Sequence, residues 1–152
     1  MDKQHLILSQ IDRKILPYAQ LKNLTMPEPG WIKSIRTALK MTLKQLGKRM
    51  KITPQSVKEI EKREKAGTVS INVLKNFGEA LEMKFVYGFI PRNDSLKNMI
   101  EERAFNVAQK IVMRTAKNME IEIQSVQKSH LEKAILELKD EIIREMPNYL
   151  WE

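Results

Sequence analysis

The sequence contains no cysteine, and its two histidines, His5 and His130, stand apart from any cluster of candidate ligands. Disulfides and thiolate metal sites are therefore excluded, and we predict no metal and no cofactor. Paired carboxylates, a Ser/His/Asp set and a glycine-rich phosphate loop are also missing, so we do not expect an enzyme. No apolar run approaches the ~20 residues of a membrane span, and the first residues do not open a signal peptide. We expect a cytoplasmic protein without a membrane partner.

Positive charge is abundant and is concentrated in one segment. The chain of 152 residues has a formal net charge of +8. Residues 31–92 hold 14 Lys and Arg against 5 Asp and Glu, whereas residues 93–152 hold 9 against 11. A basic segment is typical of proteins that bind nucleic acid, although ribosomal or membrane-surface binding would give the same balance.

Residues 42–63 contain the most informative pattern in the chain. Apolar residues recur at helical spacing after Thr42, and Thr53-Pro54 marks the start of a second helix after a tight connection. A narrow apolar stripe on the second helix leaves its outer face polar. This pattern predicts a helix-turn-helix, in which the first helix lies across the phosphate backbone and the second enters the major groove of double-stranded DNA.

Two sets of residues are predicted to contact DNA. The outer face of the second helix is expected to read base edges through Gln55, Ser56, Lys58, Glu59 and Lys62. Contacts to the DNA backbone are the alternative for all of these residues except Glu59. Backbone phosphates are expected to be bound by Thr42, Lys44, Lys48, Thr53, Arg63, Lys65 and Thr68. A solvated helix face without a ligand is the alternative for the first set.

Arg36 and Glu61 are predicted to have a structural role. Arg36 lies on a predicted helix over 31–40, and Glu61 follows the apolar Ile60 on the second helix of the motif. We predict a largely buried ion pair between them that holds these two helices together.

The remaining segments are predicted to be mostly helical. We expect an amphipathic helix over 3–16, an irregular arm to residue 30 and a helix over 71–83. Residues 84–91, rich in aromatic and β-branched side chains, predict a strand covered on both sides that pairs with the same strand of a second subunit. Two helices are predicted over residues 94–146, with a break near 127–129, because Ser129-x-x-Glu132 has the form of a capping box. The apolar seam from 131 to 142 predicts an intrachain or dimer contact.

Residues 34–83 resemble the lambda-repressor-like, or Xre-type, helix-turn-helix family. The matching positions are Ile35-Arg36, Leu46-Gly47, Ser56-Val57, Ile60-Glu61, Leu74 and Ala80-Leu81. The resemblance implies a five-helix core. With it, the expected fold is mainly all-α: a five-helix helix-turn-helix core, a short β-strand and a long helical C-terminal extension. The expected domains are an N-terminal helix and arm (1–30), a DNA-binding domain with a trailing strand (31–92) and a helical dimerisation or partner-binding region (93–152).

Nearly the whole chain is similar to a small bacterial family called mobile mystery protein A. The similarity lies in Gly30-Trp31-Ile32, Ile35-Arg36-x-Ala38-Leu39-x-Met41-Thr42, Lys62-Arg63-Glu64-x-x-Gly67, Phe85-Val86-Tyr87 with Pro91, and Leu150-Trp151. The resemblance implies a gene placed beside that of a Fic-domain protein, and hence an antitoxin-like regulator of a mobile operon.

Two functions are therefore expected. The first is a sequence-specific transcriptional regulator that represses its own operon as a homodimer, on a palindrome with half-sites about one helical turn, ~34 Å, apart. The alternative is an antitoxin-like protein that binds and neutralises a Fic-domain partner through its C-terminal helices.

Overall fold

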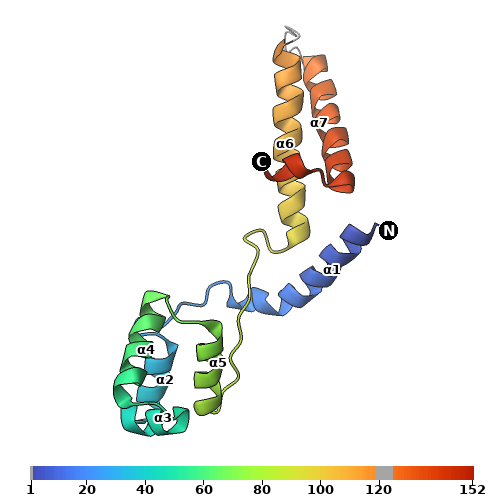
Figure 1. The fold of residues 1–152 in the computed structure, drawn as a ribbon. Helices are drawn as coiled ribbons and strands as arrows, with labels where there is room; N and C mark the ends of the chain where they lie inside the picture. The colour runs from blue at the N-terminus through green and yellow to red at the C-terminus, as the bar shows by residue number, and fades with distance from the viewer. Residues whose placement is uncertain (1, 119–124) are drawn as a thin grey trace. The chain divides into compact units, whose positions relative to one another are not determined.

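The computed structural model describes residues 2–118 and 125–152, and these residues are mainly helical (Figure 1). The elements are α1 (Lys3–Ile15), the 3-10 helix η1 (Leu16–Leu21), α2 (Trp31–Ala38), α3 (Leu43–Met50), α4 (Pro54–Ala66), α5 (Ile71–Ala80), α6 (Leu96–Asn118), α7 (Ser125–Glu145) and the 3-10 helix η2 (Asn148–Trp151). The predicted mainly all-α fold is confirmed. Over the two described ranges, no helix combines the length and apolar character needed to cross a membrane.

The chain divides into two compact units. Unit 2 is Asn23–Gly88, and unit 1 combines Met1–Lys22 with Phe89–Glu152. The segment expected as one N-terminal piece, 1–30, is thus divided between the units at residue 22. Helix α1 contacts α6, so the N-terminal helix and the C-terminal helices share one body.

Unit 2 consists of α2, α3, α4 and α5 packed around a common apolar core (Figure 1). Leu46 from α3, Val57 from α4 and Phe77 from α5 are fully buried there. Ile32 from α2 is buried in the same core, so all four helices contribute to it. The expected core had five helices, whereas residues 23–88 contain four α-helices, because no helix follows α5 within this unit.

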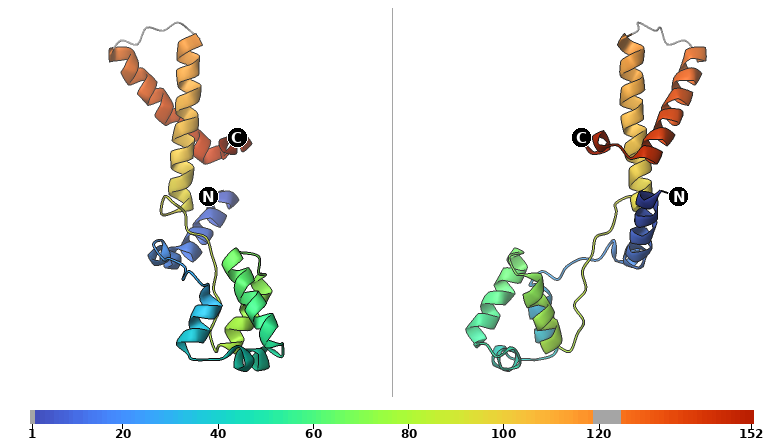
Figure 2. Two further views of the ribbon diagram at one scale, coloured as in Figure 1. Left: turned by 90° about the vertical axis from the view of Figure 1, so that its left-hand side faces the viewer. Right: turned by 45° about the vertical axis from the view of Figure 1, so that its right-hand side comes forward.

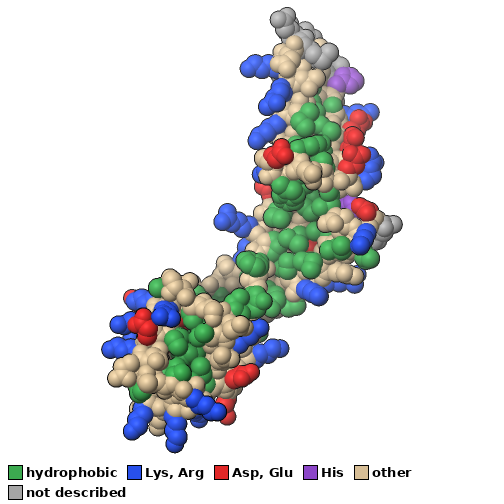
Figure 3. Space-filling view, viewed as in Figure 1, with side chains coloured by type: hydrophobic (Ala, Val, Ile, Leu, Met, Phe, Trp, Pro, Cys, Tyr) green, Lys and Arg blue, Asp and Glu red, His purple; other side chains and the backbone are tan. Residues whose placement is uncertain are grey.

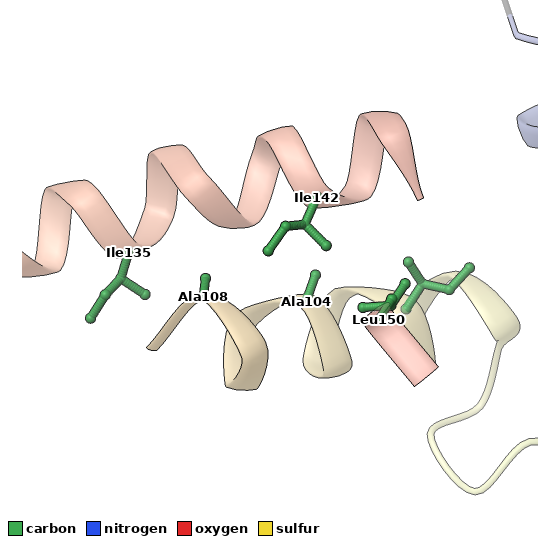
Figure 4. Packing of buried hydrophobic residues seen from close by; sticks show 6 residues of the cluster. Ala104, Ala108, Ile135, Ile142 and Leu150 are labelled. Atoms are coloured by element: carbon green, nitrogen blue, oxygen red, sulfur yellow. The ribbon is translucent and has the colours of Figure 1, made fainter. Parts of the chain in front are cut away.

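The core of unit 1 lies between α6 and α7, which contact each other and cross at an angle (Figures 1 and 2). Ile135 and Ile142 of α7 pack onto Ala104 and Ala108 of α6, and Leu150 closes the end of this layer (Figure 4). The two alanines let the helices approach closely. The apolar seam over 131–142 is therefore an intrachain contact.

The predicted break near 127–129 was wrong, because these residues lie inside α7, which begins at Ser125. Ser129 and Glu132, whose spacing suggested a helix start, are both exposed within the continuous helix α7. Two helices are nevertheless present, as expected.

Helix α1 is held in unit 1 by a polar contact that local sequence patterns did not predict. The carboxylate of Asp12 accepts hydrogen bonds from the backbone N–H of Leu96 (2.8 Å) and of Lys97 (3.2 Å). These are among the N–H groups at the start of α6 that have no partner inside the helix. Leu8 packs against the apolar core of the same unit.

The predicted β-strand over 84–91 was wrong, and none of the described residues forms a strand. A strand requires a neighbouring strand for its hydrogen bonds, and no other segment within residues 2–118 and 125–152 supplies one. The side chains expected to be covered on both sides are open instead: Val86 is 57%, Tyr87 58% and Phe89 86% exposed. Aromatic and β-branched composition alone did not distinguish an apolar connection from a strand.

Candidate nucleic-acid interface

The two helices of the motif, α3 and α4, each begin at a capping threonine. Thr42 Oγ1 accepts from the Gln45 N–H (3.1 Å), and Gln45 Oε1 accepts from the Thr42 N–H (2.8 Å). Thr53 Oγ1 accepts from the Ser56 N–H (3.1 Å). These bonds satisfy N–H groups that would otherwise lack a partner, so both helix starts are determined by local sequence.

The turn between α3 and α4 requires a residue without a side chain. A Cβ atom on Gly47 would lie 2.8 Å from the Ile52 carbonyl oxygen, closer than van der Waals contact allows. Lys51, which ends α3, adopts the left-handed conformation with φ 57°. The close approach of α3 to the start of α4 therefore depends on Gly47.

Helix α4 presents one buried and one open face. Val57 and Glu61 are buried, and they lie one turn apart on the side facing α2 and α3. Gln55, Glu59 and Lys62 are spaced by four and three residues on the opposite side, and all three are exposed. The helix is thus anchored on one side and offers polar side chains to a ligand on the other.

The predicted ion pair between Arg36 and Glu61 is present. Arg36 Nε lies 2.6 Å from Glu61 Oε1, and Arg36 Nη2 lies 3.2 Å from Oε2, so the contact is bidentate. The side chains are only 13% and 4% exposed. Arg36 Nη1 also donates to the Met41 carbonyl oxygen at 3.0 Å. The guanidinium therefore connects α2, α4 and the segment leading into α3.

A second carboxylate of α4 stabilises the start of α2. The Ile32 N–H donates to Glu64 Oε1 (3.0 Å) and Oε2 (3.2 Å), beside Gly30, whose φ is 91°. Negative charge at a helix N-terminus is favourable because of the helix dipole and the unpaired N–H groups there. Sequence reasoning missed this role. The available signal was that Gly30, at the N-cap of α2, has no side chain to supply the cap.

The predicted base-reading residues differ in their surroundings. Gln55, Lys58 and Lys62 are exposed, and in the described part of the chain their side chains make no hydrogen bond or ion pair. Glu59 is exposed but lies 3.7 Å from Arg63, one turn further along α4. The Ser56 hydroxyl is half-buried and lies 2.8 Å from Thr53 Oγ1. Ser56 is therefore already engaged in the cap of α4.

The predicted phosphate-binding residues are all exposed, and they surround α4. Lys44 and Lys48 lie on α3, Arg63 and Lys65 lie in the last turns of α4, and Thr68 lies in the loop before α5. Thr42 Oγ1 already accepts a hydrogen bond as a helix cap, so its hydroxyl proton remains for a phosphate oxygen. Thr53 Oγ1 accepts the capping hydrogen bond of α4 and also lies 2.8 Å from the Ser56 hydroxyl, so it is engaged within the protein.

Unit 2 carries most of the positive charge of the chain. It holds 13 Lys and Arg against 6 Asp and Glu, a net charge of +7, and the rest of the chain has a net charge of +1. Figure 3 shows Lys and Arg side chains around the visible face of this unit. The described residues contain no group of His, Cys, Asp and Glu that could hold a metal ion.

A capped helix, a glycine-dependent turn and a second helix with an open polar face in a basic unit define a DNA-binding helix-turn-helix protein. Residues 32–87 match a family model described as helix-turn-helix, of the Xre/lambda-repressor-like type. The comparisons with curated proteins and with solved structures gave no match.

Proposed function

We propose that the protein is a sequence-specific transcriptional regulator that binds double-stranded DNA through α4. The observation that carries this proposal is the open face of α4, where Gln55, Glu59 and Lys62 stand exposed opposite the buried Val57 and Glu61. Amide and charged side chains at such positions form bidentate hydrogen bonds to base edges in the major groove. The surrounding positive charge supplies attraction to phosphates that is independent of sequence.

We further propose that unit 1 makes the protein a homodimer on a palindromic site. Leu6, Ile7 and Ile11 of α1 are 40–49% exposed, and Phe105 and Ile111 of α6 are 38% and 41% exposed. Apolar side chains gathered on one body are typical of a surface that binds another protein. A two-fold dimer would present two copies of α4 to successive major grooves.

Autorepression of a mobile operon is part of this proposal, and it is supported by the resemblance to the mobile mystery protein A family. The alternative, neutralisation of a Fic-domain partner, would use the same exposed apolar side chains of unit 1. The fragment Asn23–Gly88 separates the two, because it has its own core. If the fragment binds the operator more weakly than the full chain but keeps the same sequence preference, the result supports a dimeric regulator. Full operator affinity, with loss of partner neutralisation alone, supports the antitoxin.

The experiment that tests DNA recognition begins with selection of preferred duplexes from a random pool by the full chain. Gln55→Ala is expected to weaken binding to the selected duplex by about 5- to 150-fold, as for loss of one bidentate base contact of about 1–3 kcal/mol. Its binding to a random-sequence duplex should not change. Gln109→Ala is the matched control, since Gln109 is an exposed glutamine of α6 in unit 1. Equal weakening on both duplexes, or no enrichment during selection, contradicts the proposal.

Dimerisation is tested by the molar mass in solution, measured by sedimentation velocity. Ile7→Glu places a charge among the exposed apolar side chains of α1 and is expected to give a monomer with reduced operator affinity. Gln10→Glu is the control, because Gln10 is an exposed residue of the same helix and already polar. A wild-type protein that is monomeric at micromolar concentration contradicts the dimer.

A further inference from the structure

A hollow of about 320 Å³ lies in unit 2 beside α4, and four lysines line it. Lys58, Lys62 and Lys65 come from α4, at spacings of four and three residues, so their side chains share one flank of that helix. Lys33 reaches the same hollow from α2. Sequence patterns on α4 did not indicate Lys33, since only tertiary packing brings α2 to this flank.

The charges around the hollow are not balanced by the protein itself. Among the described residues, none of the four ammonium groups has an ion pair or a hydrogen bond with a side chain. Glu61 also borders the hollow, but both of its oxygens are engaged by Arg36. Glu28 is the remaining carboxylate of the lining, which leaves a clear excess of positive charge. Like charges gathered at one place repel each other, and a bound anion relieves that repulsion.

The lining favours a phosphate group over a whole nucleotide. Lysine ammonium groups bind phosphate as point charges, whereas recognition of a free base relies on stacking against an aromatic side chain. The hollow is lined by lysine, glutamate and proline, without an aromatic residue. Its chemistry therefore selects for negative charge and not for a base.

The position of the hollow connects it to the open face of α4. Lys62 belongs both to the hollow and to the row that it forms with Gln55 and Glu59. When a helix lies in the major groove, the sugar-phosphate strands that border the groove pass along its flanks. A strand bordering the groove on the α2 side of α4 would pass this hollow.

We propose that the hollow binds phosphates of the DNA strand that borders the major groove on the α2 side of α4. This inference rests on the proposed DNA-binding function and adds Lys33 to the interface. It also reassigns Lys58 and Lys62 from base edges to the phosphate backbone, which leaves Gln55 and Glu59 as the base-reading pair.

The test is the salt dependence of DNA affinity for the full chain, on the selected duplex and on a random-sequence duplex. Each phosphate contact contributes about 0.9 to the slope of log K against log salt. Lys33→Ala is expected to lower the magnitude of this slope by about 0.9. The ratio of wild-type to variant affinity should therefore fall about 3.5-fold between 50 and 200 mM KCl, equally on both duplexes. Lys75→Ala is the control, since Lys75 is an exposed lysine of α5 outside the hollow. Glu28→Gln should strengthen binding to both duplexes.

Three results would overturn the assignment. The first is a slope for Lys33→Ala equal to that of the wild type. The second is a loss confined to the selected duplex, which would indicate base contact. The third is binding of inorganic phosphate alone that depends on Lys33 while duplex affinity does not, which would assign the hollow to a free anion. Failure of the wild-type chain to bind any duplex at 50 mM KCl is a different outcome, because it rejects the proposed function itself.

Discussion

Replacement of Glu61 by alanine tests the ion pair that connects α2, α4 and the segment before α3. Glu61 is 4% exposed and is bound by Arg36 at 2.6 and 3.2 Å. Its removal leaves the guanidinium, itself only 13% exposed, with the Met41 carbonyl as its remaining hydrogen-bond partner. A charge left in this position is far less well solvated than in water.

The expected cost is on the order of 3–5 kcal/mol, the range measured when one partner of a buried ion pair is removed. Unit 2 spans residues 23–88, and a domain of this size has a total stability of roughly 3–10 kcal/mol. Glu61→Ala is therefore expected to unfold a large fraction of unit 2. The milder variant Glu61→Gln keeps the shape and one acceptor, and should cost about 1–3 kcal/mol.

The assay is urea unfolding followed by circular dichroism, on the fragment Asn23–Gly88 as well as on the full chain. The double variant Arg36→Met with Glu61→Leu removes both charges at once. It therefore separates the net contribution of the ion pair to stability from the cost of leaving one buried charge without its partner. Replacement of both charges by apolar groups of similar size is expected to be neutral or stabilising. The control is Glu82→Ala, which removes an exposed partner of Arg49 at 3.4 Å and should change stability by less than about 1 kcal/mol.

A cost below about 1 kcal/mol for Glu61→Ala would refute this reasoning, because it would mean that water reaches Arg36 once the carboxylate is gone. A double variant as unstable as the single one would refute it as well. In that case the pair would contribute through its geometry and not through mutual neutralisation.

Two further substitutions test contacts that depend on tertiary structure. Gly47→Ala should lower the free energy of unfolding of unit 2 by about 1–3 kcal/mol, since the new methyl group would lie 2.8 Å from the Ile52 carbonyl oxygen. Thermal unfolding measures this loss, and an unchanged midpoint temperature contradicts the prediction. Asp12→Ala removes the acceptor for the Leu96 and Lys97 amides and should cost about 1 kcal/mol at the start of α6. Amide hydrogen exchange at these two residues should then be about fivefold faster, and unaltered exchange would show that Asp12 does not hold the helix end.

Much of unit 2 was predictable from local patterns, for a physical reason. Thr42 and Thr53 cap helices with N–H groups only three residues away, and such bonds depend on nothing distant in the chain. The Arg36–Glu61 contact spans 25 residues, yet the apolar periodicity of the two helices already placed both side chains near their packed faces. Gly67 ends α4 with a φ of 76°, a conformation that glycine adopts without steric cost.

The errors came where neighbours in space, and not in sequence, decide the outcome. Residues 84–91 have the composition of a strand, but a strand is stabilised by a paired neighbour, and no strand forms in the described part of this chain. The Ser129-x-x-Glu132 pattern has the form of a capping box, but packing of α7 against α6 continues the helix through it. The role of Glu64 as a cap for α2 was missed because the contact spans 32 residues.

By itself, the sequence determined where most helices begin, that one segment is basic, and that α4 has an apolar and a polar side, because helix caps, charge and 3.6-residue periodicity are local properties. Only the tertiary structure decided which elements share a body. Asp12 attaches α1 to α6 across more than 80 residues of chain, and Lys33 lines the same hollow as Lys58, Lys62 and Lys65. These juxtapositions arise from burial of apolar surface between elements, which no short stretch of sequence specifies.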